Sequence, residues 1–352
     1  MTINEYLLQK SIHPLLLCGD SLQILRKIPQ NSVDMVITSP PYWGKREYTS
    51  GGIGLEQNYN SFIDNLLQVI YEIKRILKQE GSFWLNIGDT YKNKSLVGIP
   101  WRIAIKMMDE QGWILRNEVI WNKVKGGMDN SKDKLGNVHE PFFHFVKTNR
   151  YYYNVDAIRS KPHKTFVKNG TVVSATGVSG IRYKRQIEMS TSLTEIEKKY
   201  AYDDLEAVLN DVKNGKISDF RMIIRGQQRV THSNNISISG RAKELSEKGY
   251  YFLKYHPNGS KPRDVWDILP EDTQNRKNHF APFPDDLCKI PILSTCPPNG
   301  IMVDPFVGTG TSVAVAYLFG RKSIGIDISQ EYIDIAYQRF CEPFLFKDVV
   351  NV

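Results

Sequence analysis

The amino-acid sequence predicts an α/β protein in which helices cover both faces of a mostly parallel sheet. Short apolar runs alternate with segments of helical apolar spacing through the first 150 residues, as expected of successive strand–helix units. The same alternation returns near residue 262, after an interval that lacks it. Two of the predicted strands end in proline- or glycine-rich turns, and ligands bind at such strand ends in open parallel sheets.

The first 150 residues divide into strands and helices in turn. The apolar runs predict strands over 15–18, 33–38, 81–87, 113–121 and 142–147. Helical spacing predicts helices over 21–28, 61–78 and 99–111. Proline marks three boundaries, since Pro29 stops the first helix, Pro40 ends the second strand and Pro100 opens the third helix.

Residues 151–260 differ from the segments on either side. They begin with three consecutive tyrosines and include a charged helical stretch at 194–213, but show no strand–helix alternation, which predicts an inserted, irregular module. The alternation resumes with strands at 300–304 and 322–327 and helices at 311–319 and 331–340. We therefore divide the chain into 1–150, 151–260 and 261–352.

The net charge of +8 is concentrated in the middle of the chain. Residues 151–260 hold 18 Lys and Arg against 11 Asp and Glu, whereas residues 261–352 hold 9 against 12. A basic segment of this kind is typical of a protein that binds a polyanion, although a solvated charged surface would have the same composition.

The composition argues against several classes of protein. No run of eighteen apolar residues could span a membrane, and the first ten residues lack the basic start and apolar stretch of a secretory signal. The four cysteines are scattered without a CxxC pair, which argues against a metal site or a disulfide framework. We therefore expect a cytoplasmic protein with no membrane segment and no metal.

A glycine-rich turn between a predicted strand and a predicted helix is the first candidate binding site. Residues 304–311 read Asp-Pro-Phe-Val-Gly-Thr-Gly-Thr, and such a turn lets the backbone approach a ligand. The next strand ends in Asp327, whose carboxylate can accept hydrogen bonds from both ribose hydroxyls of a nucleoside. A GxG turn alone is also typical of a tight connection. Val313 breaks the GxGxxG pattern, so a nucleoside fits better than a dinucleotide.

The second candidate site follows the strand at 33–38 and reads Thr-Ser-Pro-Pro-Tyr-Trp over residues 38–43. Two prolines fix the backbone and leave carbonyl groups without local donors. A serine hydroxyl, a free carbonyl and an aromatic ring are the groups that could hold an amino group on a flat ring. A proline turn with aromatic packing is the alternative, but the length of the motif and its place after an α/β strand favour a site.

Together these motifs resemble those of the amino-group DNA methyltransferases. Ser39-Pro40-Pro41-Tyr42 is similar to their catalytic motif, (Asp/Asn/Ser)-Pro-Pro-(Tyr/Phe/Trp), and residues 304–310 are similar to their S-adenosylmethionine motif. Further matches lie at 17–20, 263–268, 279–284 and 324–327. The catalytic motif comes first and a variable region separates the two, which is the β order of these enzymes, mostly partners in bacterial restriction–modification.

This resemblance covers roughly residues 15–150 and 261–340. It implies a Rossmann-like, S-adenosylmethionine-dependent methyltransferase fold with a circularly permuted motif order and an inserted target-recognition region. The cofactor would be S-adenosylmethionine, with Asp327 on the ribose hydroxyls and Asp20 near the adenine. The implied cofactor-binding residues are Asp20, Phe280, Pro282, Phe283, Asp304, Phe306, Gly308, Gly310 and Asp327.

For the catalytic motif of Ser39, Pro40, Pro41 and Tyr42, the resemblance implies methylation of an extruded base. Ser39 Oγ and the Pro40 carbonyl would accept the hydrogens of the target amino group, and Tyr42 would stack on the base. Two acceptors help to localise the nitrogen lone pair, which then attacks the sulfonium methyl in line. This reaction needs neither a metal nor a covalent intermediate.

Serine at the first motif position favours N4 of cytosine, because the adenine enzymes of this group usually carry Asp or Asn there. N6 of adenine is the alternative. A nicotinamide oxidoreductase would leave the Ser-Pro-Pro-Tyr motif unexplained, and a DNA-binding protein with a decayed site would not keep both motifs intact. Cys296, which precedes two prolines, suggests a cytosine C5 nucleophile, but its order and context favour a connecting loop.

Target recognition is expected in the basic middle segment, with double-stranded DNA as the partner. Arg221, Arg225 and Arg229 recur every four residues, which would align them on a helix, although Gly226 makes an arm equally consistent. A second cluster consists of Arg182, Lys184 and Arg185. We expect most of these side chains to contact phosphates and one or two to read guanine edges. We expect a monomer or a homodimer, and any cognate restriction endonuclease would act as a separate protein.

Overall fold

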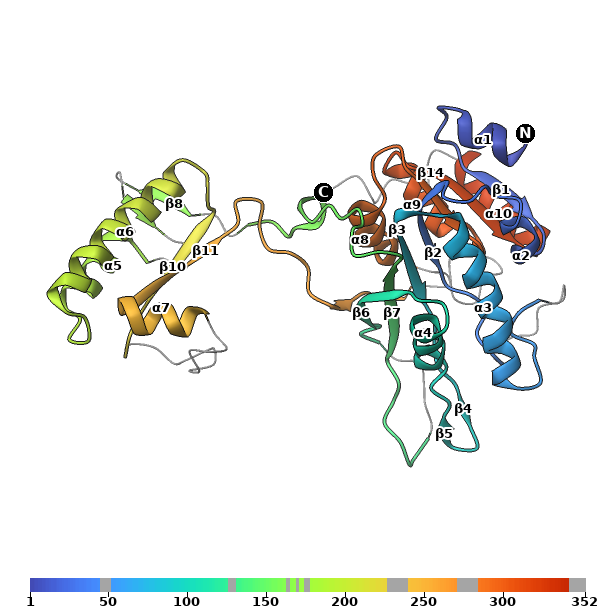
Figure 1. Ribbon diagram of the computed structural model, residues 1–352, viewed down its shortest axis with the longest axis horizontal. Helices are drawn as coiled ribbons and strands as arrows, with labels where there is room; N and C mark the ends of the chain where they lie inside the picture. The colour runs from blue at the N-terminus through green and yellow to red at the C-terminus, as the bar shows by residue number, and fades with distance from the viewer. Residues whose placement is uncertain are drawn as a thin grey trace. The chain divides into compact units, whose positions relative to one another are not determined.

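The computed structural model describes residues 1–44, 52–125, 131–162, 165–168, 171–173, 178–226, 240–270 and 284–341. The chain forms two compact units (Figure 1). Unit 1 comprises Met1–Ala157 and Arg263–Val352, and unit 2 comprises Ile158–Pro262. Unit 2 is therefore inserted between two segments that fold together.

Unit 1 is built on an eight-stranded sheet in the order β1-β14-β13-β2-β3-β7-β6-β12. Neighbouring strands are parallel, except where β7 pairs antiparallel with β3 and β6. The strands are β1 (Leu15–Cys18), β2 (Val33–Thr38), β3 (Leu77–Asn86), β6 (Ile114–Asn122), β7 (His139–Val146), β12 (Val265–Asp267), β13 (Ile301–Asp304) and β14 (Lys322–Asp327). The predicted mostly parallel α/β architecture is confirmed.

Two strands of the C-terminal segment, β13 and β14, lie between strands of the N-terminal segment, whereas β12 lies at the edge of the sheet. β13 pairs with β2 and β14, and β14 pairs with β1, so that Val303 is the register partner of both Val36 and Ile324. The carboxyl ends of β1, β14, β13, β2, β3 and β6 therefore lie at the same edge as the amino end of β7. We call this the carboxyl edge of the sheet.

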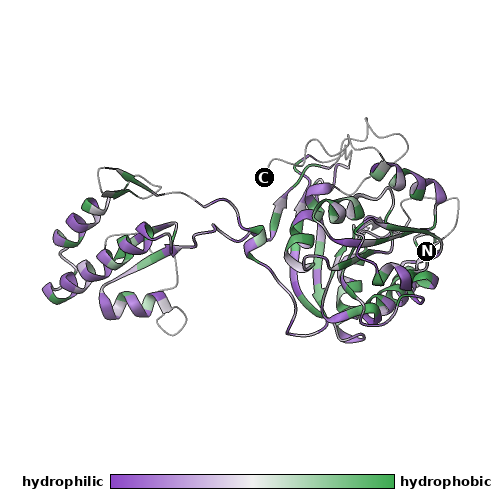
Figure 2. Cartoon of the chain, turned by 90° about the horizontal axis from the view of Figure 1, so that it is seen from above, coloured by the Kyte–Doolittle hydropathy of each residue, from purple (hydrophilic) through white to green (hydrophobic). Residues whose placement is uncertain are grey.

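Helices cover both faces of this sheet (Figure 1), and apolar residues lie on both the strands and the helices (Figure 2). The helices of unit 1 are α1 (Ile3–Leu8), α2 (Ser21–Leu25), α3 (Tyr59–Ile76), α4 (Ile99–Asp109), α8 (Asp285–Thr295), α9 (Thr311–Leu318) and α10 (Gln330–Cys341). Alternate residues of β2 point to opposite faces: Val36 packs in a cluster with α3 and α4, whereas Met35 and Ile37 pack with α8 and α9. Burial on both faces explains why three successive residues of β2, Met35 to Ile37, are all apolar.

Several boundaries differ from the sequence prediction, among them the boundary between α3 and β3. The helical spacing predicts a helix that continues through residues 77 and 78, but α3 ends at Ile76 and Leu77 already belongs to β3. Leu77 is extended and fully buried, and it pairs with Val33 of β2. Its apolar side chain therefore continues the helical spacing by coincidence, and strand pairing decides its conformation.

Unit 2 contains regular structure that the sequence did not predict. Its elements are β8 (Phe166–Lys168), β9 (Thr171–Val173), α5 (Gly180–Glu188), α6 (Glu195–Lys213), β10 (Asp219–Ile224), α7 (Gly240–Lys248) and β11 (Tyr250–Tyr255). A separate core holds them together, with Tyr183 and Ile187 of α5, Leu205 of α6, Phe220 of β10 and Tyr250 of β11 among its members. The expected irregular module is in fact a small α/β unit, although the charged helix at 194–213 was predicted correctly.

Of the two alternatives for Arg221 and Arg225, a helix or an arm, the helix is wrong. Arg221 lies in β10, which pairs antiparallel with β11, and Arg225 directly follows this strand. Phe220, Met222 and Ile224 are buried at alternate positions, so the apolar period is that of a strand. None of the helices in the part of the chain that the structure describes is long and apolar enough to cross a membrane.

Candidate active site

Segments far apart in the sequence meet at the carboxyl edge of the sheet. Thr38 ends β2, Asn86 ends β3, Asp304 ends β13 and Asp327 ends β14, while β7 begins at the same edge with His139. Ligands of open α/β sheets bind at this edge. Both sequence motifs open onto it, so the pairing of β13 with β2 places the two candidate sites next to each other.

Ser39 lies at the start of the proline turn that follows β2, and its hydroxyl is held by two neighbours. Ser39 Oγ donates to Asn86 Oδ1 at 3.2 Å and lies 3.3 Å from the Tyr42 hydroxyl. Asn86 Nδ2 in turn donates to the Pro141 carbonyl at 3.2 Å, which fixes the amide so that Oδ1 faces the motif. With its own proton engaged, the serine oxygen keeps lone pairs that can accept hydrogen bonds from a substrate.

A carboxylate that the sequence analysis did not assign completes this network. The Tyr42 hydroxyl donates to Glu140 Oε2 at 2.7 Å, and Lys123 Nζ lies 2.5 Å from Glu140 Oε1. The Glu140 side chain is only 12% exposed. Burial, together with the negative charge of Glu140, raises the pKa of the Tyr42 hydroxyl well above its usual value. Tyr42 therefore remains a proton donor at neutral pH.

Gly88, two residues beyond β3, allows this arrangement. A Cβ atom on Gly88 would lie 2.5 Å from Cε2 of Tyr42 and 3.2 Å from Oε1 of Glu140. Any other residue would therefore displace the tyrosine ring. The signals for these missed positions were weak in sequence: Asn86 is the second-last residue of the strand predicted over 81–87, and Glu140 precedes a proline just before the strand predicted over 142–147.

Asp304 connects the glycine-rich turn to the strand that precedes the proline turn through hydrogen bonds. Its Oδ1 accepts hydrogen bonds from Thr38 Oγ1 at 2.6 Å and from the Phe306 backbone at 3.0 Å, and its Oδ2 accepts one from Ser312 Oγ. Burial raises the pKa of Asp304 to about 6, although these hydrogen bonds oppose the rise. Its observed contacts are thus within the protein, and they connect the strand that precedes Ser39 with the candidate cofactor turn.

The glycines of the turn serve two different purposes. Gly308 has φ of +52° and donates its backbone N–H to Asp327 Oδ2 at 2.9 Å. Gly310 has φ of +85°, and a Cβ there would lie 2.7 Å from Cβ of Ala336 in α10. The first glycine brings the turn to the acidic residue, and the second lets the turn pack against a helix.

Asp327 ends β14 and Asp20 lies two residues after the adjacent β1, in which Cys18 is the register partner of Asp327. Asp327 Oδ1 accepts a hydrogen bond from the Ser329 backbone, and burial raises the pKa of this carboxylate. The Asp20 carboxylate caps α2 by accepting from the Gln23 backbone at 2.9 Å. A half-buried carboxylate beside a glycine turn fits a ribose, so the residues present suit a nucleoside cofactor.

Comparison with known proteins agrees with this geometry. The family model described as DNA methylase matches residues 33–338, which include both motifs. Type II methyltransferase M.SfiI of Streptomyces fimbriatus is 30% identical over 90% of this chain and 88% of its own length. Type II methyltransferase M.Cfr9I of Citrobacter freundii is 26% identical over 91% of this chain and 85% of its own length.

The chain belongs to the DNA methylase family. The resemblance inferred from the two motifs is thereby confirmed.

Solved structures support the fold of this DNA methylase. The PvuII DNA methyltransferase, which is described as cytosine-N4-specific, superposes with a TM-score of 0.57 at 17% identity over 94% of this chain and 87% of its own. A DNA modification methylase of Thermus thermophilus, solved with S-adenosyl-L-methionine, gives a TM-score of 0.50 at 18% identity over 93% and 95% of the two chains. The methyltransferase fold class is thus confirmed.

Cys296 is not placed to act as a nucleophile in this methylase. It caps the C-terminus of α8 and is fully buried. Burial raises the pKa of its thiol to about 12, so the reactive thiolate is absent at neutral pH. Among the residues that the structure describes, no group of three or more His, Cys, Asp or Glu side chains could hold a metal ion.

The predicted DNA-binding residues of the methylase lie in unit 2 and differ in their surroundings. Arg182 and Arg185 are exposed on α5, whereas Lys184 forms an ion pair with Glu206 of α6. Arg221 is exposed on β10. The predicted residues Arg229, Phe280, Pro282 and Phe283 lie outside the described residues.

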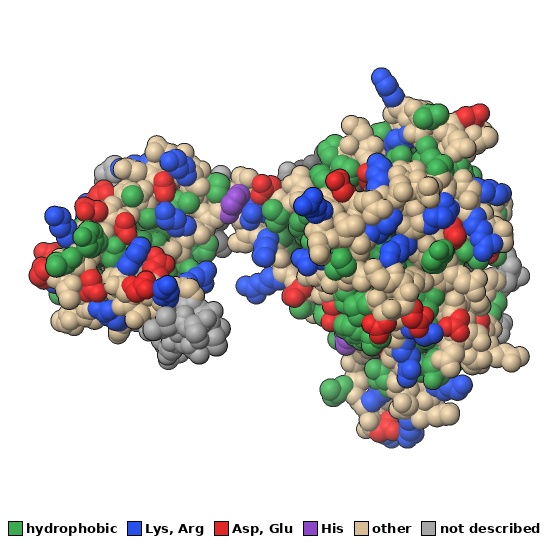
Figure 3. Space-filling model, in the orientation of Figure 1, with side chains coloured by type: hydrophobic (Ala, Val, Ile, Leu, Met, Phe, Trp, Pro, Cys, Tyr) green, Lys and Arg blue, Asp and Glu red, His purple; other side chains and the backbone are tan. Residues whose placement is uncertain are grey.

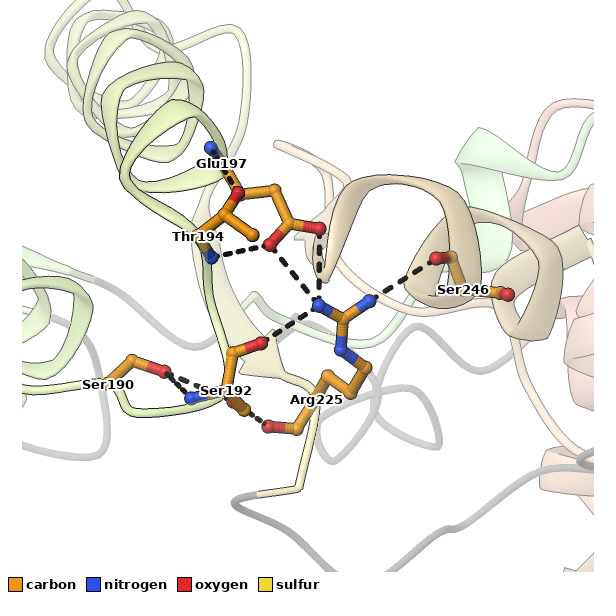
Figure 4. A network of polar contacts seen from close by, with 6 residues as sticks. All are labelled: Ser190, Ser192, Thr194, Glu197, Arg225 and Ser246. Carbon is orange, nitrogen blue, oxygen red and sulfur yellow. Dashed lines mark hydrogen bonds and ion pairs between the residues drawn. The ribbon is translucent and has the colours of Figure 1, made fainter.

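Arg225 is held by a network inside unit 2 (Figure 4). Its Nη2 donates to both carboxylate oxygens of Glu197 at 3.2 Å and to the Ser192 carbonyl at 2.8 Å, and its Nη1 donates to the Ser246 carbonyl at 3.3 Å. Glu197 also closes the capping box of α6 with Thr194. The guanidinium therefore joins the start of α6, the end of β10 and α7, which favours a structural role.

We predict that Asp304→Asn changes how stability depends on pH. Because the folded-state pKa, about 6, lies above the unfolded value, the wild-type carboxyl contributes stability at low pH that is lost as pH rises through 6. Relative to that of the variant, the free energy of unfolding of the wild type should fall by roughly 2 kcal/mol between pH 4 and pH 7. Urea unfolding at several pH values measures this, with Asp109→Asn on the exposed end of α4 as control. If the free energies of unfolding of wild type and Asp304→Asn changed in parallel with pH, the raised pKa of Asp304 would be contradicted.

We predict that Arg225→Met destabilises unit 2 by about 2 kcal/mol, because Glu197 and two carbonyl groups lose a charged donor. Hydrogen exchange of the α6 and β10 amides in the full chain should accelerate. Arg182→Met, at an exposed position of α5, should leave exchange nearly unchanged. Unchanged exchange in Arg225→Met together with weaker DNA binding would instead make Arg225 a DNA contact.

Proposed function

We propose that this DNA methylase transfers a methyl group from S-adenosylmethionine to N4 of cytosine in duplex DNA, as the modification enzyme of a restriction–modification system. The observation that carries the proposal is the Ser39 hydroxyl at the carboxyl edge. Its proton is directed to Asn86, so its lone pairs are available to an amino group. The Type II methyltransferases among its relatives support the biological setting.

The bound cofactor supplies an electrophilic methyl group on a sulfonium. Asp327 and the backbone of Gly308, already joined by a hydrogen bond, hold its nucleoside part. Phe306, half-buried beside them, offers an apolar surface. Asp304 does not need to touch the cofactor, because its contact with Thr38 keeps the cofactor turn in register with Ser39.

The target cytosine leaves the duplex and stacks on the ring of Tyr42. The bond from the Tyr42 hydroxyl to Glu140 holds one end of this ring and fixes its plane. Ser39 Oγ and the Pro40 carbonyl then accept the two hydrogens of the amino group. These acceptors are in place before the reaction, so they stabilise the positive charge that develops on nitrogen without reorganising.

A second surface for DNA lies in unit 1, next to the catalytic motif. We define the basic projection as β4 (Tyr91–Lys92), β5 (Ser95–Leu96), their connection and residues 131–138. Positive side chains gather on it at the bottom of Figure 3. Lys94 pairs with Asp133, and the Lys134 ammonium lies 4.9 Å from the ring centre of Tyr91, so the two segments lie side by side.

The basic projection is connected to the proline turn. Lys92 Nζ lies 5.5 Å from the ring centre of Trp43, the residue that follows Tyr42. Lys92, Lys94, Lys132 and Lys134 outnumber the acidic Asp133 on this projection. Such a surface suits the phosphates on either side of an extruded base, while the exposed Arg182, Arg185 and Arg221 of unit 2 would serve target recognition.

We predict that Ser39→Ala reduces methyl transfer by about 10²–10³, because one preorganised acceptor is lost. Binding of S-adenosylmethionine, measured by calorimetry, should stay near the wild-type value. Wild-type protein, tritiated cofactor and mixed-sequence duplex DNA should yield labelled N4-methylcytosine after digestion to nucleosides.

Ser61→Ala, at an exposed position of α3, is the matched control and should keep full activity. Label in N6-methyladenine would overturn the cytosine assignment while leaving the family intact. A fully active Ser39→Ala protein would remove Ser39 from the site.

We predict that Lys92→Gln combined with Lys94→Gln weakens DNA binding equally for all sequences. The slope of log affinity against log salt should become shallower by about 0.9 for each phosphate that the variant no longer neutralises. Lys10→Gln combined with Lys27→Gln is the control, since both lysines are exposed near the opposite edge of the sheet. An unchanged salt slope in the first variant would show that the basic projection does not bind DNA.

A further inference from the structure

The Ser39 hydroxyl belongs to a row of hydrogen-bonding groups that ends at a carboxylate. Ser39 Oγ lies 3.3 Å from the Tyr42 hydroxyl, which donates to Glu140 Oε2 at 2.7 Å. Of the groups in this network, Asn86 is an amide, Ser39 and Tyr42 are hydroxyls, and Glu140 alone has a carboxylate that can accept a proton. The row therefore leads from the substrate side of the motif to a carboxylate that is only 12% exposed.

The geometry gives this row a direction. The hydroxyl of Tyr42 has one proton, and its bond to Glu140 at 2.7 Å is shorter than its 3.2 Å separation from Asn86 Oδ1. Lys123 occupies the other oxygen of Glu140 and holds the carboxylate in place. The tyrosine oxygen also accepts a hydrogen bond from the Gly88 backbone and lies 3.3 Å from Ser39 Oγ, so the serine hydroxyl can rotate from Asn86 to Tyr42 without leaving hydrogen-bond distance.

Methylation of an amino group creates a proton that has to leave. When the amino nitrogen attacks the methyl carbon, the nitrogen briefly carries two hydrogens, the new methyl group and a positive charge. The neutral N-methyl product forms when one N–H bond breaks and its electron pair returns to nitrogen. Loss of this proton as the N–C bond forms would prevent the full charge from accumulating on nitrogen.

We propose that Ser39, Tyr42 and Glu140 form a proton relay that removes this proton during methyl transfer. The proton passes from the amino nitrogen to Ser39 Oγ, the serine proton passes to the Tyr42 oxygen, and the tyrosine proton passes to Glu140 Oε2. Both hydroxyls end neutral, the substrate loses its positive charge, and the Glu140 carboxylate becomes a carboxylic acid. After product release, the acid returns the proton to solvent past the partly exposed Lys123.

The inference rests on the proposed role of Ser39 at the target amino group and adds roles for the Tyr42 hydroxyl and Glu140 Oε2. It gives Tyr42 a second function, since the ring stacks on the base while the hydroxyl conducts a proton. It gives Glu140 a positioning and proton-accepting function that acts through Tyr42. It also accounts for Gly88, whose missing side chain makes room for the ring between Asn86 and Glu140.

Tyr42→Phe is the decisive variant, because it keeps the aromatic ring for stacking and removes only the hydroxyl. We expect the single-turnover rate of methyl transfer to fall by about 10²-fold, within the usual range for general acid–base catalysis, with cofactor and DNA affinities near wild type. The rate of Glu140→Gln should fall by a similar factor. The rate of the double variant should fall no further than that of either single variant, because both substitutions interrupt one relay.

The solvent isotope effect separates a relay from a structural role. Wild-type methyl transfer should slow in deuterium oxide with a curved proton inventory, and Tyr42→Phe should lose most of this effect. Tyr71→Phe, exposed on α3, and Glu110→Gln, at the exposed C-cap of α4, are the controls and should match the wild type.

Two outcomes would overturn the relay. A Tyr42→Phe protein that transfers methyl groups at the wild-type rate would show that stacking is the only function of Tyr42. Independent, multiplying losses in the double variant would show that Glu140 acts apart from Tyr42. If Ser39→Ala is inactive while Tyr42→Phe is fully active, the relay fails and the proposed function stands; if Ser39→Ala is fully active, both fail.

Discussion

The pairing of β13 with β2 is the constraint on which the site depends. This pairing inserts two C-terminal strands between strands of the N-terminal segment and places Asp304 beside Thr38. The buried carboxylate then accepts hydrogen bonds from Thr38, from Ser312 of α9 and from the backbone of the glycine-rich turn. A buried carboxylate with so many donors has little freedom to move, so the turn that suits the cofactor and the turn that carries Ser39 keep a fixed separation.

Burial keeps two side chains protonated, Tyr42 in the site and Cys296 at the C-terminus of α8. Tyr42 stays protonated because its hydroxyl is buried and lies against Glu140. The thiol of Cys296 stays protonated because burial raises its pKa to about 12, and it therefore leaves the chemistry to the oxygen atoms of the proline turn. The proposed reaction is one of positioning, in which acceptors hold an amino group, an aromatic ring holds its base, and a carboxylate lies behind the ring.

The basic character of the chain has more than one origin. Part of the positive charge of unit 2 is internal, since Arg225 is bound by Glu197 and Lys184 by Glu206. Unit 1, in contrast, carries a lysine-rich surface on the basic projection beside Trp43. Counting charges along the chain located the excess correctly but did not distinguish a charge that stabilises the fold from one that faces solvent. That distinction requires the partners of each side chain, which only the folded structure supplies.

The sequence by itself determined the alternation of strands and helices, the two motifs and their order, because apolar period and turn chemistry are local properties. It identified Ser39, Tyr42, the glycine-rich turn and Asp327 as the groups to examine. The tertiary structure decided which of these groups touch. Glu140, Asn86 and Gly88 join the catalytic motif only because the end of β3 and the start of β7 lie at the same edge of one sheet. The tertiary structure also decided that residues 219–224 form a strand, although the arginine spacing suited a helix. Pairing with β11 and burial of Phe220, Met222 and Ile224 outweigh any local preference there.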